Sequence, residues 1–438
     1  MEAGLASVVR WISAPMYRLL MAYVPFVLVN LALDFYVLRH GRLAFPAMQE
    51  RRRAWWGIGY GVLQGLIYGG LPFLAWLGWE QQPALFRNVV QTSVLAVLVF
   101  KLWALPWWLM EDGRRAWIAA MDRIFGKPKP TPTKVAQGEG LSRRAFLSRL
   151  GYILGAVPLL SLGAAAVSGS AYRYRVHFQR VVIKGLPASF KGKRLVQLSD
   201  LHTGSWDDAE AIRKGIQMVL DLKPDLLVFT GDLVNTQTAE VEPWMEVLRL
   251  LQAPLGVYSV LGNHDYGDYR AWGSPEEKAQ NFEQMLRTHR DLGWHLLRNE
   301  SVRIAGENGD FLELVGCENW GKRSGFGKQY GDIQKAMGGV STPGPHLLLT
   351  HDPSHFDLQV LGKYPSVALT LSGHTHGMQM GIDIPGLARW SPASWVYPHW
   401  AGFYDFGDQQ LYVNRGFGFV GFRGRLGIFP EITCLELG

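Results

Sequence analysis

Four apolar stretches in the first 172 residues constrain the fold of this chain more than any other feature. Each is close to the roughly 20 residues that a helix needs to cross the hydrocarbon core of a bilayer. None of them carries the charged face that a helix of a soluble domain presents to water. We therefore expect four membrane-spanning helices, at about residues 19–38, 54–79, 88–110 and 146–172.

The distribution of charge supports this membrane region. Residues 1–172 contain 18 Lys and Arg against 8 Asp and Glu, whereas the remaining residues contain 26 against 29. The net charge of +7 therefore arises beside the apolar stretches, where a basic excess is typical of membrane topology. The lipid bilayer is an expected partner, and no nucleic-acid partner is expected.

Basic residues in the short loops predict the orientation of the helices. Arg39, Arg42 and residues 51–53 follow the first span, and eight Lys and Arg residues lie between the third and fourth spans. Only Arg87 lies between the second and third spans. Because basic loops stay in the cytoplasm, we expect a multi-pass protein of the bacterial inner membrane whose C-terminal domain lies on the outer, periplasmic side.

The predicted domain boundaries follow from these stretches. We expect three spanning helices within residues 1–125, a cytoplasmic linker at 126–145, the fourth helix at 146–172 and the C-terminal domain at 173–438. The segment 142–147 resembles a twin-arginine export signal, although its two arginines could equally serve the positive-inside rule. Lys101 interrupts the third span, and either a functional site or a structural role, in which the lysine snorkels or faces a helix partner, would explain it.

From about Arg173 onward the pattern changes to short apolar runs that end in polar residues, which is typical of buried strands. Two stretches of helical length and periodicity, 209–222 and 240–251, separate the first three runs. Strands that alternate with helices early and then follow one another predict an α/β sandwich. The expected strands are 194–199, 226–230, 257–261, 312–316, 347–350, 367–371, 411–413 and 432–437.

Residues of metal-binding types follow five of these runs. In open α/β sheets, ligands bind beyond the carboxyl ends of the strands, so the five segments are expected to meet at one site. Together and in this order they resemble the calcineurin-like metallophosphoesterases, from about Lys193 to the last expected strand. The segments are Ser199–His202, Gly231–Asn235, Gly262–Asp265, Thr350–Asp352 and Gly373–Gly377.

The resemblance implies a fold, an activity and a set of ligands. The fold would be α/β, with an N-terminal four-helix transmembrane region followed by a calcineurin-like α/β sandwich phosphoesterase domain. The activity would be metal-dependent hydrolysis of phosphoric esters. The implied ligands are Asp200, His202 and His376 for one ion, Asn263, His351 and His374 for the other, and Asp232 as the bridge between both.

The chemistry of these side chains supports that division. A carboxylate is best able to share its charge between two cations, and imidazoles and an amide oxygen complete the ligand shells. Nitrogen and oxygen ligands without a thiolate suit manganese, iron or zinc, so two divalent ions of these kinds are the expected cofactors. Two ions about 3.5–4 Å apart can hold a hydroxide and clamp the phosphoryl oxygens for in-line attack.

His264 and Asp265 are the expected catalytic residues. The resemblance implies that His264 neutralises developing charge or protonates the leaving oxygen, and that Asp265 orients it. The alternative for His264 is a capping role in its turn. Asn235 stands where many relatives have an aspartate, which should alter the tuning of the site. The backbone is expected to turn sharply beside the ions at Gly231, Gly262 and Gly373.

Two irregular segments are candidates for substrate selection. Residues 319–332 are glycine-rich and carry Lys322, Arg323 and Lys328, which would meet an extra phosphate or be solvated. Residues 384–404 are rich in aromatic side chains, which suit a membrane interface, an apolar substrate group or packing on their own domain. Because the spans tether the site near the bilayer, a lipid-linked phosphate or pyrophosphate is the preferred substrate. A periplasmic nucleotide or phosphodiester, and a non-catalytic metal-bound scaffold or sensor, remain alternatives.

Overall fold

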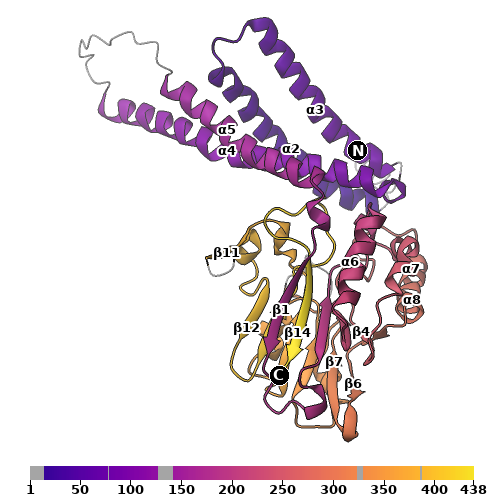
Figure 1. The fold of residues 1–438 in the computed structure, drawn as a ribbon. Helices are drawn as coiled ribbons and strands as arrows, with labels where there is room; N and C mark the ends of the chain where they lie inside the picture. Colours follow the sequence, from indigo (N-terminus) through magenta and orange to yellow (C-terminus); the bar gives the residue numbers. More distant parts are fainter. Residues whose placement is uncertain (1–13, 77, 127–141, 323–328, 385–386) are drawn as a thin grey trace, which may run out of the picture. The chain divides into compact units, whose positions relative to one another are not determined.

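The computed structural model describes residues 14–76, 78–126, 142–322, 329–384 and 387–438. The chain divides into two compact units, one comprising residues 1–83 and 90–164 and the other residues 84–89 and 165–438. Long helices make up the first unit, and two β-sheets with shorter helices make up the second (Figure 1).

Four long helices occur where the apolar stretches predict them. By length and composition, α4 and α5 could cross a membrane, and among the described residues α2 and α3 do not reach the same threshold of hydropathy. Most of the linker expected at 126–145 lies outside the described residues. The helices are α2 (Ala14–Ala44), α3 (Glu50–Trp76), α4 (Ala84–Phe125) and α5 (Arg143–Val167).

Lys101 of α4 is buried among polar side chains of α2 and α3. Its ammonium nitrogen lies 2.6 Å from Oδ1 of Asp34, and it donates to the amide oxygens of Asn30 and Gln64 at 3.1 and 3.0 Å. The hydroxyl of Tyr60 donates to the same Asp34 carboxylate at 2.5 Å. Of the two explanations for a lysine in a spanning segment, the structure therefore supports contact with neighbouring helices.

Two six-stranded mixed sheets form the second unit. The first sheet consists, in spatial order, of β1 (Arg175–Val181), β14 (Glu431–Leu437), β2 (Arg194–Leu198), β3 (Leu226–Phe229), β4 (Val257–Ser259) and β5 (His295–Leu296). The second consists of β12 (Gly402–Asp405), β13 (Gln410–Val413), β9 (Val367–Ser372), β8 (His346–Leu349), β7 (Phe311–Gly316) and β6 (Glu300–Ala305). A separate antiparallel hairpin pairs β10 (Ile382–Ile384) with β11 (Ala388–Trp390).

Successive side chains of the central strands are buried on opposite faces, so this unit is a layered sandwich. Leu195 of β2 and Leu347 of β8 belong to one core between the two sheets. The next residues along the same strands, Val196 and Leu348, belong to two further cores beneath the helices. Those helices are α6 (Ala209–Asp221), α7 (Met245–Leu248), α8 (Pro275–Asp291) and α9 (Ile333–Met337), of which α6, α7 and α8 lie together on one side of the first sheet (Figure 1).

The prediction of one continuous helix at 240–251 was wrong. A 3-10 helix occupies Thr238–Trp244, and only the four residues of α7 are α-helical. Pro243 explains the difference, because proline lacks the amide hydrogen that an α-helix interior needs and its ring clashes with the preceding turn. The eight predicted strands are all present, and their ends differ from the prediction by at most two residues.

Candidate metal centre

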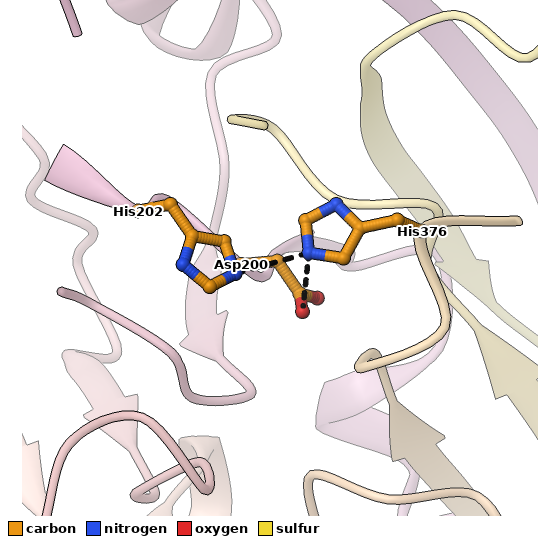
Figure 2. Close-up of side chains that lie close together, drawn as sticks. All are labelled: Asp200, His202 and His376. Carbon is orange, nitrogen blue, oxygen red and sulfur yellow. Dashed lines mark hydrogen bonds and ion pairs between the residues drawn. The ribbon is translucent and has the colours of Figure 1, made fainter. Parts of the chain in front are cut away.

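Asp200, His202 and His376 lie close enough together to share one metal ion. Nε2 of His202 is 3.0 Å from Nε2 of His376, and the latter atom is 3.1 Å from Oδ1 of Asp200 (Figure 2). Two nitrogen atoms each about 2.1 Å from one ion lie about 3.0 Å apart at a right angle and about 3.4 Å apart at a tetrahedral angle. The observed spacing therefore fits a common ion.

Asp232, His351 and His374 form a second group of the same kind. Nε2 of His351 is 3.2 Å from Nδ1 of His374 and 3.0 Å from Oδ2 of Asp232. The same Asp232 oxygen is 3.6 Å from Nε2 of His202 in the first group. The Asp232 carboxylate thus reaches an imidazole of each group.

Asn263 adds an oxygen atom that lacks a partner. Its side-chain nitrogen donates to the hydroxyl of Tyr269 at 2.8 Å, while its side-chain oxygen is buried and accepts no hydrogen bond from the described residues. A buried polar atom without a partner costs about 1–3 kcal/mol. Coordination of a divalent cation would satisfy this oxygen. The side chains gathered here therefore fit a bound metal ion.

The backbone is strained at five of the expected ligands. The φ angles are positive, in the left-handed region, at residues that have a Cβ atom. Each such residue costs on the order of 1–3 kcal/mol and persists only where its surroundings enforce it, which is typical of functional sites. The angles are 53° at Asp200, 49° at His202, 60° at Asp232, 73° at His374 and 49° at His376.

The three glycines of the motifs serve two different purposes. Gly231 has a φ of 95°, as a sharp turn requires. Gly262 and Gly373 do not have positive φ, but the chain turns at both, since the Gly262 carbonyl accepts a hydrogen bond from the Asp265 amide at 3.3 Å and the Gly373 carbonyl from the Thr375 amide at 2.9 Å. A Cβ atom there would collide with the carboxylate of Asp232 or Asp200, so these glycines allow close approach of the loops.

Asp232 and His351 form a buried ion pair. Burial opposes the charge on Asp232, but the neighbouring imidazoles, first among them His351, together outweigh it and hold the pKa of that carboxyl well below its usual range. Burial also opposes the charge on His351, and Asp232 together with Asp200 and the Thr230 carbonyl outweighs it and raises the pKa of the imidazole to about 10. Burial lowers the pKa of His202, His374 and His376, which favours the neutral form that binds metal.

His264 is held by the main chain of another motif. Its Nδ1 lies 2.6 Å from the carbonyl oxygen of Asn235, so Nδ1 donates and Nε2 is left for the site. The ring packs against the rings of Tyr269 and His202, with centroid distances of 4.4 and 4.9 Å. His264 is half-buried, as is His374, whereas His202, His351 and His376 are buried, so the His264 ring is partly accessible to a leaving group.

Asn235 orients a ligand with its side chain as well. Its Oδ1 accepts a hydrogen bond from Nδ1 of His202 at 3.0 Å, which directs Nε2 of that ring to the site. Its Nδ2 donates to the hydroxyl of Ser205 at 2.9 Å, which fixes the amide with its oxygen toward His202. The change from aspartate to asparagine therefore keeps the orienting contact.

Asp265 does not contact the His264 ring, so the expectation that it orients that ring was wrong. Its carboxylate accepts hydrogen bonds from the backbone amides of Asp232, Leu233 and Gly262 at 2.8–2.9 Å. Burial, with Asp232 nearby, raises the pKa of Asp265 to about 7. Asp265 instead ties together the two loops that carry Asp232 and Asn263.

Arg425 is a partner of the site that sequence reasoning missed. The side chain is fully buried, and one guanidinium nitrogen lies 3.2 Å from Nδ1 of His376. It also donates to the backbone carbonyls of Arg415 at 2.7 Å and Gly416 at 3.1 Å, and burial lowers the pKa of Arg425 to about 10. No motif marks it, because it lies 49 residues beyond His376 in the chain.

Tyr397 is the second missed partner. Its hydroxyl lies 2.8 Å from Nε2 of His374, and a carboxylate oxygen of Asp352 lies 3.5 Å from the same nitrogen. Tyr397 and Trp400 are buried, whereas Trp395 is largely exposed. Packing on the domain thus explains part of the aromatic segment 384–404. In the 319–332 segment, Arg323 and Lys328 lie outside the described residues.

Two family models match this chain. A model described as "Calcineurin-like phosphoesterase" matches residues 193–378, a range that includes every expected ligand. A model described as "Probable Calcineurin-like phosphoesterase, transmembrane domain" matches residues 17–170. The chain is thus a membrane-associated metallophosphoesterase, with a helical transmembrane domain followed by a mixed α/β hydrolase domain of a kind that normally uses divalent metals.

Similar proteins agree with this class. The metallophosphoesterase YkuE of Bacillus subtilis is 30% identical over 301 residues, which cover 68% of this chain and 98% of that protein. With this match, the chain belongs to the calcineurin-like phosphoesterase family. The UDP-2,3-diacylglucosamine pyrophosphatase LpxG of Chlamydia muridarum is 30% identical over 53% of this chain and 79% of its own length. A zebrafish transmembrane protein with a metallophosphoesterase domain is 31% identical over 59% of this chain, which spans 56% of that relative.

Proposed function

We propose that this chain hydrolyses a lipid-linked phosphate ester or pyrophosphate with two divalent metal ions at the outer face of a bacterial inner membrane. The contact of Asp232 with both histidine groups carries the proposal. One carboxylate oxygen lies 3.0 Å from His351 and 3.6 Å from His202, which is the position a bridging ligand occupies.

The side chains divide the work among them. Asp200, His202 and His376 would hold one ion, and Asn263, His351 and His374 would hold the other. When bound, a pair of manganese, iron or zinc ions would lower the pKa of a water molecule and neutralise the phosphoryl oxygens. Nε2 of the doubly protonated His264 ring would give its proton to the leaving oxygen, and the ring would be left neutral with its remaining proton on Nδ1, against the Asn235 carbonyl. Asp265 would keep the two loops in register.

The substrate class is inferred from the transmembrane domain and from one relative. A site attached to membrane helices meets lipid-borne groups at high local concentration. The relative LpxG is named as a pyrophosphatase of a diacylated sugar nucleotide. The basic loops predict that the active site of this chain lies on the outer side, where a lipid precursor confined to the cytoplasmic leaflet would not reach it.

Activity and metal content of the full chain test the reaction. The protein would be purified in detergent, stripped of metal, reloaded with manganese, iron or zinc, and assayed on a chromogenic monoester, a chromogenic diester and a short-chain lipid pyrophosphate. We expect two ions per chain and metal-dependent turnover, with Asp232→Ala losing both the second ion and turnover. Binding of two ions without hydrolysis of any substrate would favour the scaffold alternative, and preference for a nucleotide diester would favour the nucleotide alternative.

Thiol labelling tests the orientation. The only two cysteines, Cys317 and Cys434, are buried, and burial raises the pKa of both thiols, so background labelling is low. A Glu210→Cys variant places a thiol on an exposed position of α6. We expect a membrane-impermeant maleimide to label it in spheroplasts; labelling only after lysis would place the domain in the cytoplasm.

A further inference from the structure

A pocket of about 630 Å³ opens in the second unit, away from the expected metal ligands. It lies where the edge strand of the first sheet, β1, approaches the edge strand of the second sheet, β12. The hairpin of β10 and β11 borders it, and Figure 1 shows β1, β11 and β12 on the same side of this unit. The volume is in the range of sites for small molecules.

Two arginines in this pocket are held by aromatic rings. The guanidinium of Arg175 lies 4.0 Å from the ring centroid of Phe429, and that of Arg389 lies 5.3 and 5.7 Å from those of Trp400 and Tyr404. Neither arginine has a carboxylate partner within the part of the chain that the structure describes. The rings fix the planes of these cations by cation–π contact and leave their N–H donors available to an anion.

A third arginine of the pocket shows the contrast. Arg415 contacts Glu431, and its other terminal nitrogen lies 2.7 Å from the Asp383 carboxylate, so two carboxylates face this one guanidinium. With Arg175 and Arg389, the three arginines exceed these two carboxylates by one positive charge, and the two ring-held guanidinium groups are the ones without a carboxylate among the described residues. Guanidinium groups suit the oxygen atoms of a phosphate.

The mouth of the pocket is apolar. Phe178, Ile384 and Leu387 line it and have exposed fractions of 72%, 50% and 79%. Exposed large apolar side chains that adjoin a charged pocket are typical of a binding surface rather than of ordinary solvent-facing structure. A ligand with a phosphate at one end and a hydrocarbon chain at the other would match both halves.

We propose that this pocket binds the phosphate group of an acylated lipid, with Arg175 and Arg389 on the phosphate and the acyl chain on the apolar mouth. The site is separate from the catalytic centre, because none of its lining residues is an expected metal ligand. A short chain of hydrogen bonds nevertheless connects the pocket to that centre. The carbonyl of Arg415 in the pocket wall accepts a hydrogen bond from Arg425, whose guanidinium contacts His376.

Photolabelling of the full chain tests the site. The protein would be placed in phosphatidylcholine nanodiscs that contain a small fraction of phosphatidic acid with a photoreactive acyl chain, and labelled peptides would be mapped by mass spectrometry. We expect labels on residues 175–181, 382–384 and 387–390. The double variant Arg175→Ala and Arg389→Ala should lower this labelling by about tenfold or more, because it removes both guanidinium donors to the phosphate.

Matched variants and probes separate the outcomes. The double variant Arg287→Ala and Arg290→Ala, which removes two exposed arginines of α8, should label like the wild type. Leu387→Glu places a carboxylate on an exposed residue, so it should reduce labelling even if the arginine variant folds poorly. Excess unlabelled phosphatidic acid should compete with the probe and abolish labelling. Excess inorganic phosphate should have little effect on labelling. A photoreactive diacylglycerol, which lacks the phosphate, should label the pocket only weakly.

Three results would overturn the proposal. Undiminished labelling in both Arg175→Ala/Arg389→Ala and Leu387→Glu would remove the site. Equal labelling by the diacylglycerol probe would reduce it to an apolar surface without phosphate recognition. Complete displacement by inorganic phosphate would make it a site for free phosphate.

Discussion

Nδ1 of His264 lies 2.6 Å from the backbone carbonyl oxygen of Asn235, so the main chain fixes the ring that we propose as the proton donor. This contact leaves Nε2 as the only nitrogen able to exchange a proton with a substrate. His264 is not itself an expected metal ligand, and among the imidazoles expected to bind metal its ring packs against that of His202. Loss of the ring should therefore affect turnover far more than metal binding.

His264→Ala should lower kcat by about 10²- to 10⁴-fold, because it removes a general acid. Metal content, measured on the same preparation, should stay at the wild-type value. His295→Ala, on the distant strand β5, is the matched control and should keep full activity. An unchanged kcat in His264→Ala would mean that the histidine only caps its turn and is not the proton donor.

Asn235→Ala should weaken metal binding about 10- to 100-fold, because His202 loses the partner that orients it. Titration of the metal-free full chain with manganese or zinc would measure the change. Asn235→Asp should restore affinity, since a carboxylate can accept the same hydrogen bond. Gln217→Ala on the exposed face of α6 serves as the control, and an equal loss there would deny Asn235 a specific role.

Glu431 should make the protein sensitive to acid. Burial opposes its ionisation, but Arg415, together with hydrogen bonds from Thr433 and Tyr412 and the other positive charge nearby, outweighs burial and holds the pKa of Glu431 at about 2. Because the pKa is lower in the folded state than the roughly 4.3 of an unfolded chain, this stabilisation is present above about pH 5 and is lost as the pH falls through 4.3 toward 2. A difference of about two units corresponds to about 3 kcal/mol.

Thermal unfolding of Glu431→Gln across this pH range measures the effect. The variant should be less stable at neutral pH and should lose less stability than the wild type between pH 5 and 3. Glu246→Gln, at an exposed position, should follow the wild-type curve. If the stability of the wild type and of Glu431→Gln falls equally between pH 5 and 3, other carboxylates cause the loss of stability in acid.

Lys101 and Asp34 should be strongly coupled in the helical unit. Replacing one partner leaves an uncompensated buried charge, which costs about 3–5 kcal/mol, whereas replacing both removes that penalty. A double-mutant cycle of Lys101→Met and Asp34→Leu, unfolded in mixed detergents and followed by circular dichroism, would measure the coupling. The exposed pair Lys214 and Glu210 should show no measurable coupling, and additive effects for the buried pair would refute the expectation.

Sequence reasoning located the strands that end at the metal centre because both faces of those strands are buried and polar ligands follow them at once. It failed where burial is partial. Helix α8 buries only a narrow face, including Met285 and His289, beneath a highly charged surface, so its apolar periodicity is weak. Edge strand β1 and the short hairpin strands β10 and β11 carry few buried residues, and they were missed for the same reason.

The expected ligands could be named from sequence because each lies in a compact motif with its own glycine or strand end. The groups that tune them could not. Arg425 and Tyr397 reach the imidazoles from loops that have no motif, and only the folded chain brings them there. The error over Asp265 has the same origin, because a carboxylate next to a histidine in sequence binds the backbone of another loop instead.

Strand β14, residues 431–437, lies between β1 and β2 in the first sheet. The ribosome therefore releases β1 and β2 long before the strand that must separate them exists. Until residue 437 has left the ribosome, the sheet that carries Asp200 has an open seam, and a chain that stops a few residues short cannot close it. Metal should therefore bind only after translation of the chain is complete. A truncated chain should be degraded by cellular proteases before it binds metal.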